Sequence, residues 1–531
     1  MNQQEQDLMA LGTELHTKKL AFNSQCQDIA DNFYPERANF TAPHILGKDF
    51  AIQLYSSYPL IIRRELGDVF STMSRPQSEK WFYMGLLDEE REDHQAKQWM
   101  EEKACLMRRV MYDPRSRFTR SMKEGDHDWI TFGQCVLSAE LNRTRDGILY
   151  RDWHLRDMAW TEGYSGHVDM YFRNWKPTIR QLKQYFGSEA LHNSLQDVET
   201  KRLNDTVNCM HIFVPRESYE ISDLPYVSMY VDVDHKHVIE LVPMPYEYYI
   251  APRWATISDS QYAFSPAIIA ALPDARLYQD MTRVILEAGQ KAVDPPMIAV
   301  ADAITSAIDI QPGGVTMASA EYDERLGEVL RPMTVDKSGL PLGLNMLDRV
   351  QAMLAKAMYI DKLNLPQGGD MTAYETSVRF QEYIRTILPL FEPKEAEMEA
   401  KVCQLTFDIM MRHGAMGSVS DIPQSMQGAE YQFRFVSPLS KAIEEKKTNI
   451  FGQVVNVLQA AAQFDPTVIA NLDLNESLRD AIIGTGAEED WLRDEDTVAQ
   501  EQAAQKQQQQ ASQQMALTQQ AKDLMSVQPR H

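Results

Sequence analysis

The sequence predicts an α+β protein that is mainly α and contains several folding units. Apolar residues recur with helical spacing over most of the chain, and only the segment from Cys135 to Ile250 alternates with the period of two that strands show. At 531 residues the chain is too long for one hydrophobic core. Hydrophobic residues make up 44% and charged residues 24%, which is the composition of a globular protein, so we expect any disorder to be local.

Helices are expected over about the first 130 residues. One helical face carries apolar residues at three- and four-residue spacing, namely Ile62, Leu66, Val69, Phe70 and Met73. Phe118, Met122 and Trp129 indicate another helix. We interpret the acidic run at 88–93 as the solvated start of a helix rather than as a metal cluster.

Two β-hairpins are expected in the alternating segment. The first has strands at 136–141 and 148–153 and turns at Asp146-Gly147, a dipeptide that supplies the positive φ angles of a tight turn. The second has strands at 226–233 and 238–242.

The turn of the second hairpin contains His235 and His237, a pattern that can bind a metal ion. No third ligand is close in the sequence, so we interpret it as a plain exposed turn. A helix over 178–186, ended by Gly187, lies between the hairpins. The segment is therefore α+β rather than a series of βαβ units.

A pair of long helices is expected next. Ser265-Pro266 combines an N-cap serine with proline at the first helical position, so a helix runs from there to about Lys291, with a kink expected at Pro273. Its predicted apolar stripe comprises Leu277, Met281, Val284, Ile285 and Ala288. The return helix, over 343–363, is expected to bury Leu347, Val350, Leu354, Ala357 and Met358.

Between these helices, 293–340 predicts a small α/β unit with a strand at 297–300 and a turn at 312–314. A loop over 364–370 precedes a capping box from Thr372 to Glu375, which starts a long helix toward Gly414.

Further features are predicted along the C-terminal part of the chain. They are bends at Pro389 and Pro393, a strand at 431–436, a helix opened by Ser437-Pro438 and a short helix from Asn475 to Gly484. The last 33 residues are rich in Gln and Ala, and such a polar helix needs neighbours to hold it.

Charge and cysteine content exclude several classes of protein. The formal net charge of −23 has the wrong sign for a protein that grips nucleic acid through a broad basic face. Five scattered cysteines without a C-x-x-C pair argue against a disulfide framework or a zinc ribbon. Because there is no signal-peptide pattern and no apolar run of about 18 residues, we expect a soluble chain made in the cytosol.

Catalytic motifs are absent from the sequence. It contains no G-x-x-x-x-G-K-[ST], H-E-x-x-H or G-x-S-x-G. The nearest approach to a nuclease site is Asp274 with Glu287 and Lys291, which fall on one predicted helix and cannot converge on a metal ion. We therefore expect no catalytic residues, no metal site and no cofactor.

Several strings, spread in order along most of the chain, are similar to those of one viral family. They are Ser74-Arg-Pro-Gln-Ser-Glu-Lys-Trp-Phe82, Arg253-Trp254, Tyr262-Ala-Phe-Ser-Pro266, Ala271-Leu-Pro-Asp274, Asp294-Pro-Pro296, Pro312-Gly-Gly-Val315, Met371-Thr-Ala-Tyr-Glu375 and Phe435-Val-Ser-Pro-Leu-Ser-Lys-Ala442. With the order of long helix, small inserted unit, return helix, glycine-rich loop and bent helix, the chain resembles the podovirus-type head-to-tail connector (portal) proteins of tailed double-stranded DNA bacteriophages.

The resemblance implies a portal fold assembled as a ring. It assigns a wing (1–264), stem helix 1 (265–292), clip (293–340), stem helix 2 (341–363), tunnel loop (364–371), long bent helix (372–414), crown (415–498) and C-terminal barrel helix or disordered tail (499–531).

It also implies a function and a set of partners. Twelve copies would form a channel for double-stranded DNA at one capsid vertex of the virion, used in packaging and ejection. Terminase and tail adaptor proteins would dock on it, and major capsid, scaffolding and internal core or ejection proteins would be further partners, without a membrane. Two alternatives remain, a metal-dependent DNA-processing enzyme and a cytosolic scaffold or adaptor without DNA passage.

The resemblance places candidate site residues in three groups. Channel residues in the tunnel loop would be Asn364, Pro366, Gln367, Gly368 and Gly369, unless this segment is a plain turn between helices. Lys356 and Lys362 would either face DNA or pair with acids of a neighbouring subunit. Clip residues for docking would be Tyr322, Arg325 and Arg331, with solvated surface as the alternative for each.

Overall fold

The computed structural model describes residues 1–42, 45, 47, 54–77, 79–88, 91–142, 144–258, 260–300, 303–309, 316, 317, 319, 323, 325, 328–333, 339–360 and 389–435, with shorter pieces between 451 and 482. The chain forms two compact units. Unit 1 comprises Met1–Ser71, Arg120–Ser138 and Arg151–Met398, and unit 2 comprises Thr72–Thr119, Ala139–Tyr150 and Glu399–His531. Helices and strands are mixed, so the expected α+β class is confirmed.

Helices predicted in the N-terminal part are present. They are α1 (Gln3–Lys18), α2 (Leu20–Phe33), α3 (Tyr58–Ser74), α4 (His94–Met111) and α5 (Phe118–Phe132). Ile62, Leu66 and Phe70 of α3 are buried, as expected from their spacing. Asp93 caps α4, because its side chain accepts a hydrogen bond from the Ala96 N–H at 2.7 Å.

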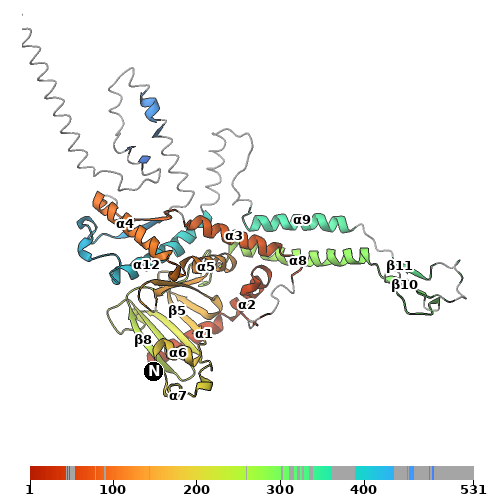
Figure 1. The fold of residues 1–531 in the computed structure, drawn as a ribbon, viewed down its shortest axis with the longest axis horizontal. Coiled ribbons are helices and arrows are strands. Elements are labelled where there is room, and N and C mark those ends of the chain that lie inside the picture. Colours follow the sequence, from red (N-terminus) through yellow and green to blue (C-terminus); the bar gives the residue numbers. More distant parts are fainter. Residues whose placement is uncertain are drawn as a thin grey trace, which may run out of the picture. The chain divides into compact units, whose positions relative to one another are not determined.

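Unit 1 contains an antiparallel sheet of five strands (Figure 1). In spatial order these are β4 (Met158–Glu162), β5 (Val168–Trp175), β6 (Cys209–Pro215), β7 (Tyr226–Asp232) and β8 (His237–Met244). The predicted second hairpin is confirmed as β7 and β8.

Helices cover both faces of this sheet. Because strand side chains alternate between faces, Met210 lies with the core under α1, whereas Cys209 lies with the core under α6 (Ile179–Phe186) and α7 (Asn193–Gln196). Gly12 lets α1 approach closely, since a Cβ atom there would lie 2.6 Å from Phe172 Cδ1. The predicted helix at 178–186 is confirmed as α6, with a Thr178 capping box and Gly187 at its C-cap.

The first predicted hairpin is confirmed as β2 (Val136–Leu141) and β3 (Ile148–Trp153), which form a small sheet with β9 (Tyr249–Ile250). The predicted turn chemistry is wrong. Arg145 has the positive φ angle, 56°, and Gly147 does not. Two hydrogen bonds stabilise the turn instead, so no glycine is needed at the left-handed position. Asn142 Nδ2 donates to Asp146 Oδ1, and the Asp146 backbone N–H donates to Asn142 Oδ1.

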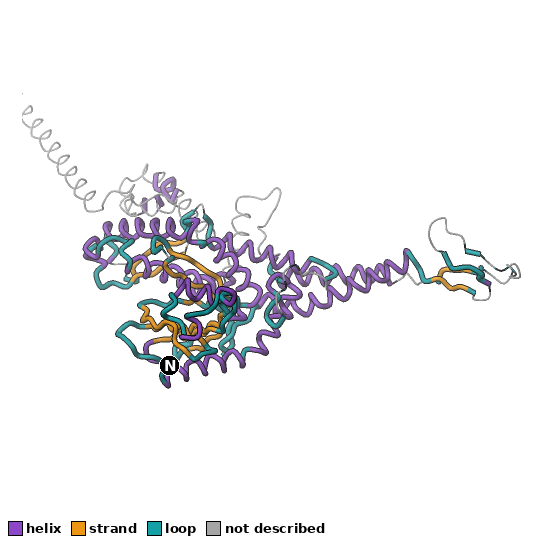
Figure 2. Tube along the Cα trace, turned by 60° about the horizontal axis from the view of Figure 1, so that its bottom comes forward, coloured by secondary structure: helices purple, strands orange, loops and turns teal. Residues whose placement is uncertain are grey.

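The two long helices are α8 (Pro266–Val293) and α9 (Gly339–Ala357), and they pack side by side in unit 1 (Figure 2). Ser265 caps α8 as predicted, accepting a hydrogen bond from the Ile268 N–H at 3.2 Å. Pro273 lies inside one continuous helix. The return helix starts four residues earlier than predicted. Between them, β10 (Met297–Ala299) pairs with β11 (Leu330–Pro332), as expected for a strand at 297–300.

Unit 2 contains a strand pair that joins distant parts of the sequence. β1 (Phe82–Leu86), which was not predicted, pairs with β12 (Tyr431–Phe435), which was. Their aromatic side chains form part of the core around the fully buried Trp81. The helix α12 (Ala400–Arg412) follows a π-helical turn at Glu395–Glu399 and ends before Gly414, as predicted.

Other predictions lie outside the described residues. These are the turn at 312–314, the loop at 364–371, the capping box from Thr372 to Glu375, the helix opened by Ser437-Pro438, the cap at Asn475 and the tail at 499–531. In the part of the chain that the structure describes, no helix has both the length and the apolarity needed to span a bilayer.

Candidate functional site

The face of α8 turned away from its own unit carries apolar side chains. Ile269, Leu277 and Val284 are 50%, 46% and 55% exposed. At 100° per residue they span about 80° of the helix surface, roughly opposite to buried Ala271 and Tyr278. Leu277 and Val284 belong to the predicted apolar stripe, and they stay exposed because the helix has two apolar faces and unit 1 covers only one.

α9 carries a similar exposed stripe. Leu342, Met346 and Met353 are 63%, 49% and 49% exposed and lie within about 40° of one another around the helix. Val350, Leu354 and Met358 are buried, as predicted, whereas Leu347 and Ala357 are partly exposed. Two long helices thus leave ordered apolar surface uncovered in a single chain, which is typical of an interface with another chain.

Cations accompany the stripe of α9. Lys356 is exposed, and Arg349, which the sequence analysis missed, is exposed seven residues earlier on the same side of the helix. Among the residues described, neither cation has a carboxylate within ion-pair distance. The seven-residue spacing from Lys356 was the signal that could have identified Arg349.

The acids and the lysine considered for a nuclease site lie along α8. Asp274 and Lys291 are seventeen residues apart on this continuous helix, which separates them by about 25 Å along its axis. Arg283 lies 3.3 Å from Glu287, in an ordinary ion pair along the helix. The described residues contain no group of three His, Cys, Asp or Glu side chains placed to hold a metal ion.

The predicted clip residues are only partly described. Arg331 is exposed on β11, and Arg325 is exposed in the preceding loop, where its N–H donates to Asp323 Oδ1 at 3.0 Å. Tyr322 lies outside the described residues. A cleft of about 430 Å³ opens nearby, between the end of α8 and the two strands, and its lining includes Pro296, Met297 and Leu330.

The predicted channel loop lies wholly outside the described residues. This holds for Asn364, Pro366, Gln367, Gly368 and Gly369, and also for Lys362. Their roles stay predictions from the resemblance.

Close packing in unit 1 determines where α8 starts. Gly133, at the end of α5, has φ +78°, and a Cβ atom there would lie 2.1 Å from the Phe264 carbonyl carbon. Ser265 Oγ also donates to the Ile130 carbonyl. The first turn of α8 is therefore held against α5 by backbone contact.

Buried ionisable groups contact one another in the same region. Arg37 bonds both Asp128, at 2.6 Å, and Asp152, at 2.8 Å. Burial raises the pKa of both carboxyl groups, and repulsion from Asp128 adds to the effect at Asp152, while Arg37 opposes it. Lys394 lies 2.9 Å from Asp126, and both side chains are fully buried.

The histidine turn between β7 and β8 is more ordered than expected. His235 stacks on His192 with ring centroids 4.9 Å apart, and His237 lies 5.7 Å from His192. His235 Nδ1 bonds Asp232 Oδ2 at 2.7 Å. The fold thus brings a third imidazole to this turn, although the rings stack instead of pointing at a common centre.

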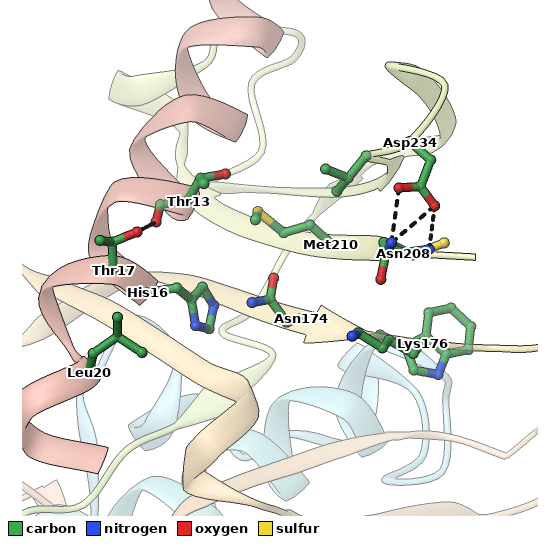
Figure 3. A pocket seen from close by; sticks show the side chains of 12 residues that line it. Thr13, His16, Thr17, Leu20, Asn174, Lys176, Asn208, Met210 and Asp234 are labelled. Atoms are coloured by element: carbon green, nitrogen blue, oxygen red, sulfur yellow. Dashed lines mark hydrogen bonds between the residues drawn. The ribbon is translucent and has the colours of Figure 1, made fainter. Parts of the chain in front are cut away.

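A cleft of about 400 Å³ lies between α1 and the ends of β5, β6 and β7, and several polar side chains line it (Figure 3). His16 Nε2 donates to the Phe172 carbonyl at 3.1 Å, and burial, with the nearby charge of Lys19, lowers the pKa of His16 to about 4. Asn208 donates to Asp234 through its backbone and its side chain. These polar groups mainly satisfy partners within the chain, so the cleft offers no converging set of ligand contacts.

Comparison with known proteins points to one family. A family model described as bacteriophage head to tail connecting protein matches residues 5–492. A portal protein of Salmonella phage epsilon15 is 20% identical over 481 residues, which is 88% of this chain and 84% of the relative. A probable portal protein of Bordetella phage BPP-1 is 25% identical over 319 residues, which is 58% of this chain and only 56% of that relative's length.

Proposed function

Because the chain belongs to the bacteriophage head to tail connecting protein family, we propose that it assembles into a closed ring at one capsid vertex and conducts double-stranded DNA. Twelve copies would form the channel used in packaging and ejection. In this proposal terminase and the tail adaptor dock on the segment 293–340, and capsid, scaffolding and internal core or ejection proteins contact other parts of the ring. The chain itself supplies no catalytic step.

The observation that carries the ring is the exposed apolar stripe on each long helix. Fully burying a Leu, Ile, Val or Met side chain contributes about 1.5–3 kcal/mol, so covering the exposed half contributes about 1 kcal/mol. Six such side chains on α8 and α9 then supply roughly 6 kcal/mol of gross stabilisation per interface. A second copy of the chain can cover these stripes with its own long helices, and repeating this contact from subunit to subunit closes a ring.

The domain assignment follows from the same proposal. α8 and α9 correspond to the two stem helices, and β10 with β11 belongs to the clip. The first and second parts of the wing, the crown and the C-terminal barrel keep the boundaries expected from the resemblance.

The negative net charge of the chain supports a DNA channel whose wall does not bind DNA tightly. Twelve copies of a chain with formal charge −23 would carry −276 formal charges. Repulsion of phosphates from such a wall is screened beyond about 8 Å at physiological salt. Arg349 and Lys356 would add rings of positive charge, or would pair with acids of the neighbouring subunit.

Native mass spectrometry of the purified chain, with negative-stain images, tests the ring directly. We expect a closed assembly of about twelve copies with a central hole. A stable monomer or dimer would contradict the proposal and favour an adaptor. Divalent-metal-dependent DNA cleavage that vanishes in Asp274→Ala would instead favour an enzyme.

Packaging assays test the tunnel loop. Gly368→Trp with Gly369→Trp is expected to leave the ring assembled and to reduce DNA packaging, because two indoles would narrow the channel. Gly368→Ala with Gly369→Ala is the matched control, because methyl groups at the same two positions add little volume to the channel. Normal packaging by the double variant would remove the loop assignment.

A further inference from the structure

A strongly basic segment stands out in this acidic chain. Residues 103–119 contain five cations and one acid, Asp113, although the whole chain has a formal charge of −23. The segment covers the end of α4, the 3-10 turn Pro114–Ser116 and the start of α5, all in unit 2. This positive charge is confined to one short part of the sequence.

One arginine joins this segment to the tip of the β2–β3 hairpin. Arg115 Nη1 lies 2.9 Å from Asp146 Oδ2, and Arg115 Nη2 lies 2.9 Å from Asp113 Oδ2. The two loops thus share one guanidinium, which offsets one of the two carboxylate charges. Arg117 and Arg145, which are close neighbours of these bonded residues in the chain, therefore come to lie on one surface.

The remaining arginines of this surface have no acidic partner among the described residues. Arg109, Arg117 and Arg145 are all exposed. Arg117 and Arg145 also have φ angles of 57° and 56°, in the left-handed region where a side chain is disfavoured and glycine is preferred. Two unpaired arginines thus stand in tight turns, Arg117 at the end of the 3-10 turn and Arg145 in the hairpin turn that Asn142 and Asp146 stabilise.

The two segments that carry these arginines expose no large hydrophobic side chain among their described residues. The same holds for all described residues between Leu87 and Tyr164. Protein partners usually bind through a core of apolar and aromatic anchors, which is missing here. Phosphate groups need no such anchor, and the planar guanidinium binds them through paired hydrogen bonds.

We propose that Arg117 and Arg145 form a binding surface for the phosphate backbone of double-stranded DNA. The surface is distinct in sequence from the tunnel loop. The proposal rests on the proposed function, which supplies the DNA. Because the rest of the chain is acidic, such a surface holds DNA at one place and leaves it repelled elsewhere.

Fluorescence anisotropy of the full-length protein with a labelled duplex of random sequence, over a range of salt concentrations, measures this binding. Each phosphate contact contributes about −0.9 to the slope of log K against log salt. Arg117→Glu with Arg145→Glu is expected to weaken binding at least tenfold at low salt and to reduce the slope by about 2. Unchanged affinity and slope would overturn the proposal.

The matched control makes the same change of charge elsewhere. Arg180→Glu with Arg202→Glu alters two arginines exposed on α6 and on the 3-10 turn Thr200–Arg202. We expect this variant to keep the wild-type slope. An equal loss of binding in the control would show that only net charge matters, and would overturn the assignment to these residues.

A third variant separates binding from folding. Arg117→Gly relieves the left-handed backbone, so we expect a raised melting temperature together with a slope reduced by about 1. If the charge-reversal variant changes the oligomeric state in native mass spectrometry but binds DNA like wild type, the surface meets an acidic protein and the proposal fails. If the chain forms no ring but still binds DNA through these arginines, the proposed ring is refuted and the proposed DNA-binding surface stands.

Discussion

The stripe on α8 leads to a quantitative prediction for ring assembly. Leu277 and Val284 are each about half exposed in the single chain, so an interface that covers them gains about 1 kcal/mol from each side chain. Leu277→Ala with Val284→Ala removes most of this gain, about 2 kcal/mol per interface. Since 1.4 kcal/mol is a factor of ten, each contact weakens roughly 30-fold.

Sedimentation velocity over a series of protein concentrations measures the effect. The midpoint of assembly is expected to move to a concentration roughly 30-fold higher in the double variant, because each subunit contributes one such interface to the ring. Circular dichroism should show unchanged helix content, since alanine is the best helix former.

Leu20→Ala provides the control. Leu20 is 61% exposed at the start of α2, where it lines the cleft beside α1, so its truncation removes a similar apolar side chain outside the two exposed stripes. We expect this variant to assemble like wild type. The reasoning is refuted if the α8 double variant assembles at the wild-type concentration, or if the control weakens assembly equally.

Three further predictions concern stability and assembly. Burial raises the pKa of Asp152 in the folded protein above its value in the unfolded chain, so its favourable contribution to stability is present at low pH and lost as the pH rises through the raised pKa. Asp152→Asn should therefore be about 1–3 kcal/mol more stable than wild type at high pH, with little difference near pH 4, as measured by urea titration. Lys394→Met should lower the free energy of unfolding by about 3–5 kcal/mol, because it leaves Asp126 buried without its cation, and adding Asp126→Asn should restore part of the loss. Deleting 499–531 should leave ring formation intact by native mass spectrometry, and loss of the ring would show that the tail is needed for assembly.

Local sequence signals predicted the elements that depend on nearby residues. Ser265-Pro266 starts α8, and Gly187 ends α6, because caps act within a single helical turn. β1 was missed, because its partner β12 lies about 350 residues further along the chain. A strand whose hydrogen bonds depend on so distant a segment has no local signal strong enough to identify it.

The hydrophobic pattern of the sequence predicts which helices are apolar, whereas packing decides which of their side chains are buried. The spacing of Leu277 and Val284 marks an apolar helix, but a helix with two apolar faces does not indicate which face meets its own unit. The first hairpin shows the same limit. Its strands follow from alternation, whereas the left-handed Arg145 depends on the side-chain bonds of the turn.

The sequence by itself determined the helices of the long pair, the strong negative charge and the ordered strings by which the chain resembles portal proteins, since all of these depend on neighbouring residues or on composition. Only the tertiary structure decided which apolar stripes stay uncovered and which charges share a buried site with Arg37. The same is true of the bond between Arg115 and Asp146 that joins two loops. These contacts depend on close packing between segments that are far apart in the sequence, so the pattern of neighbouring residues cannot predict them.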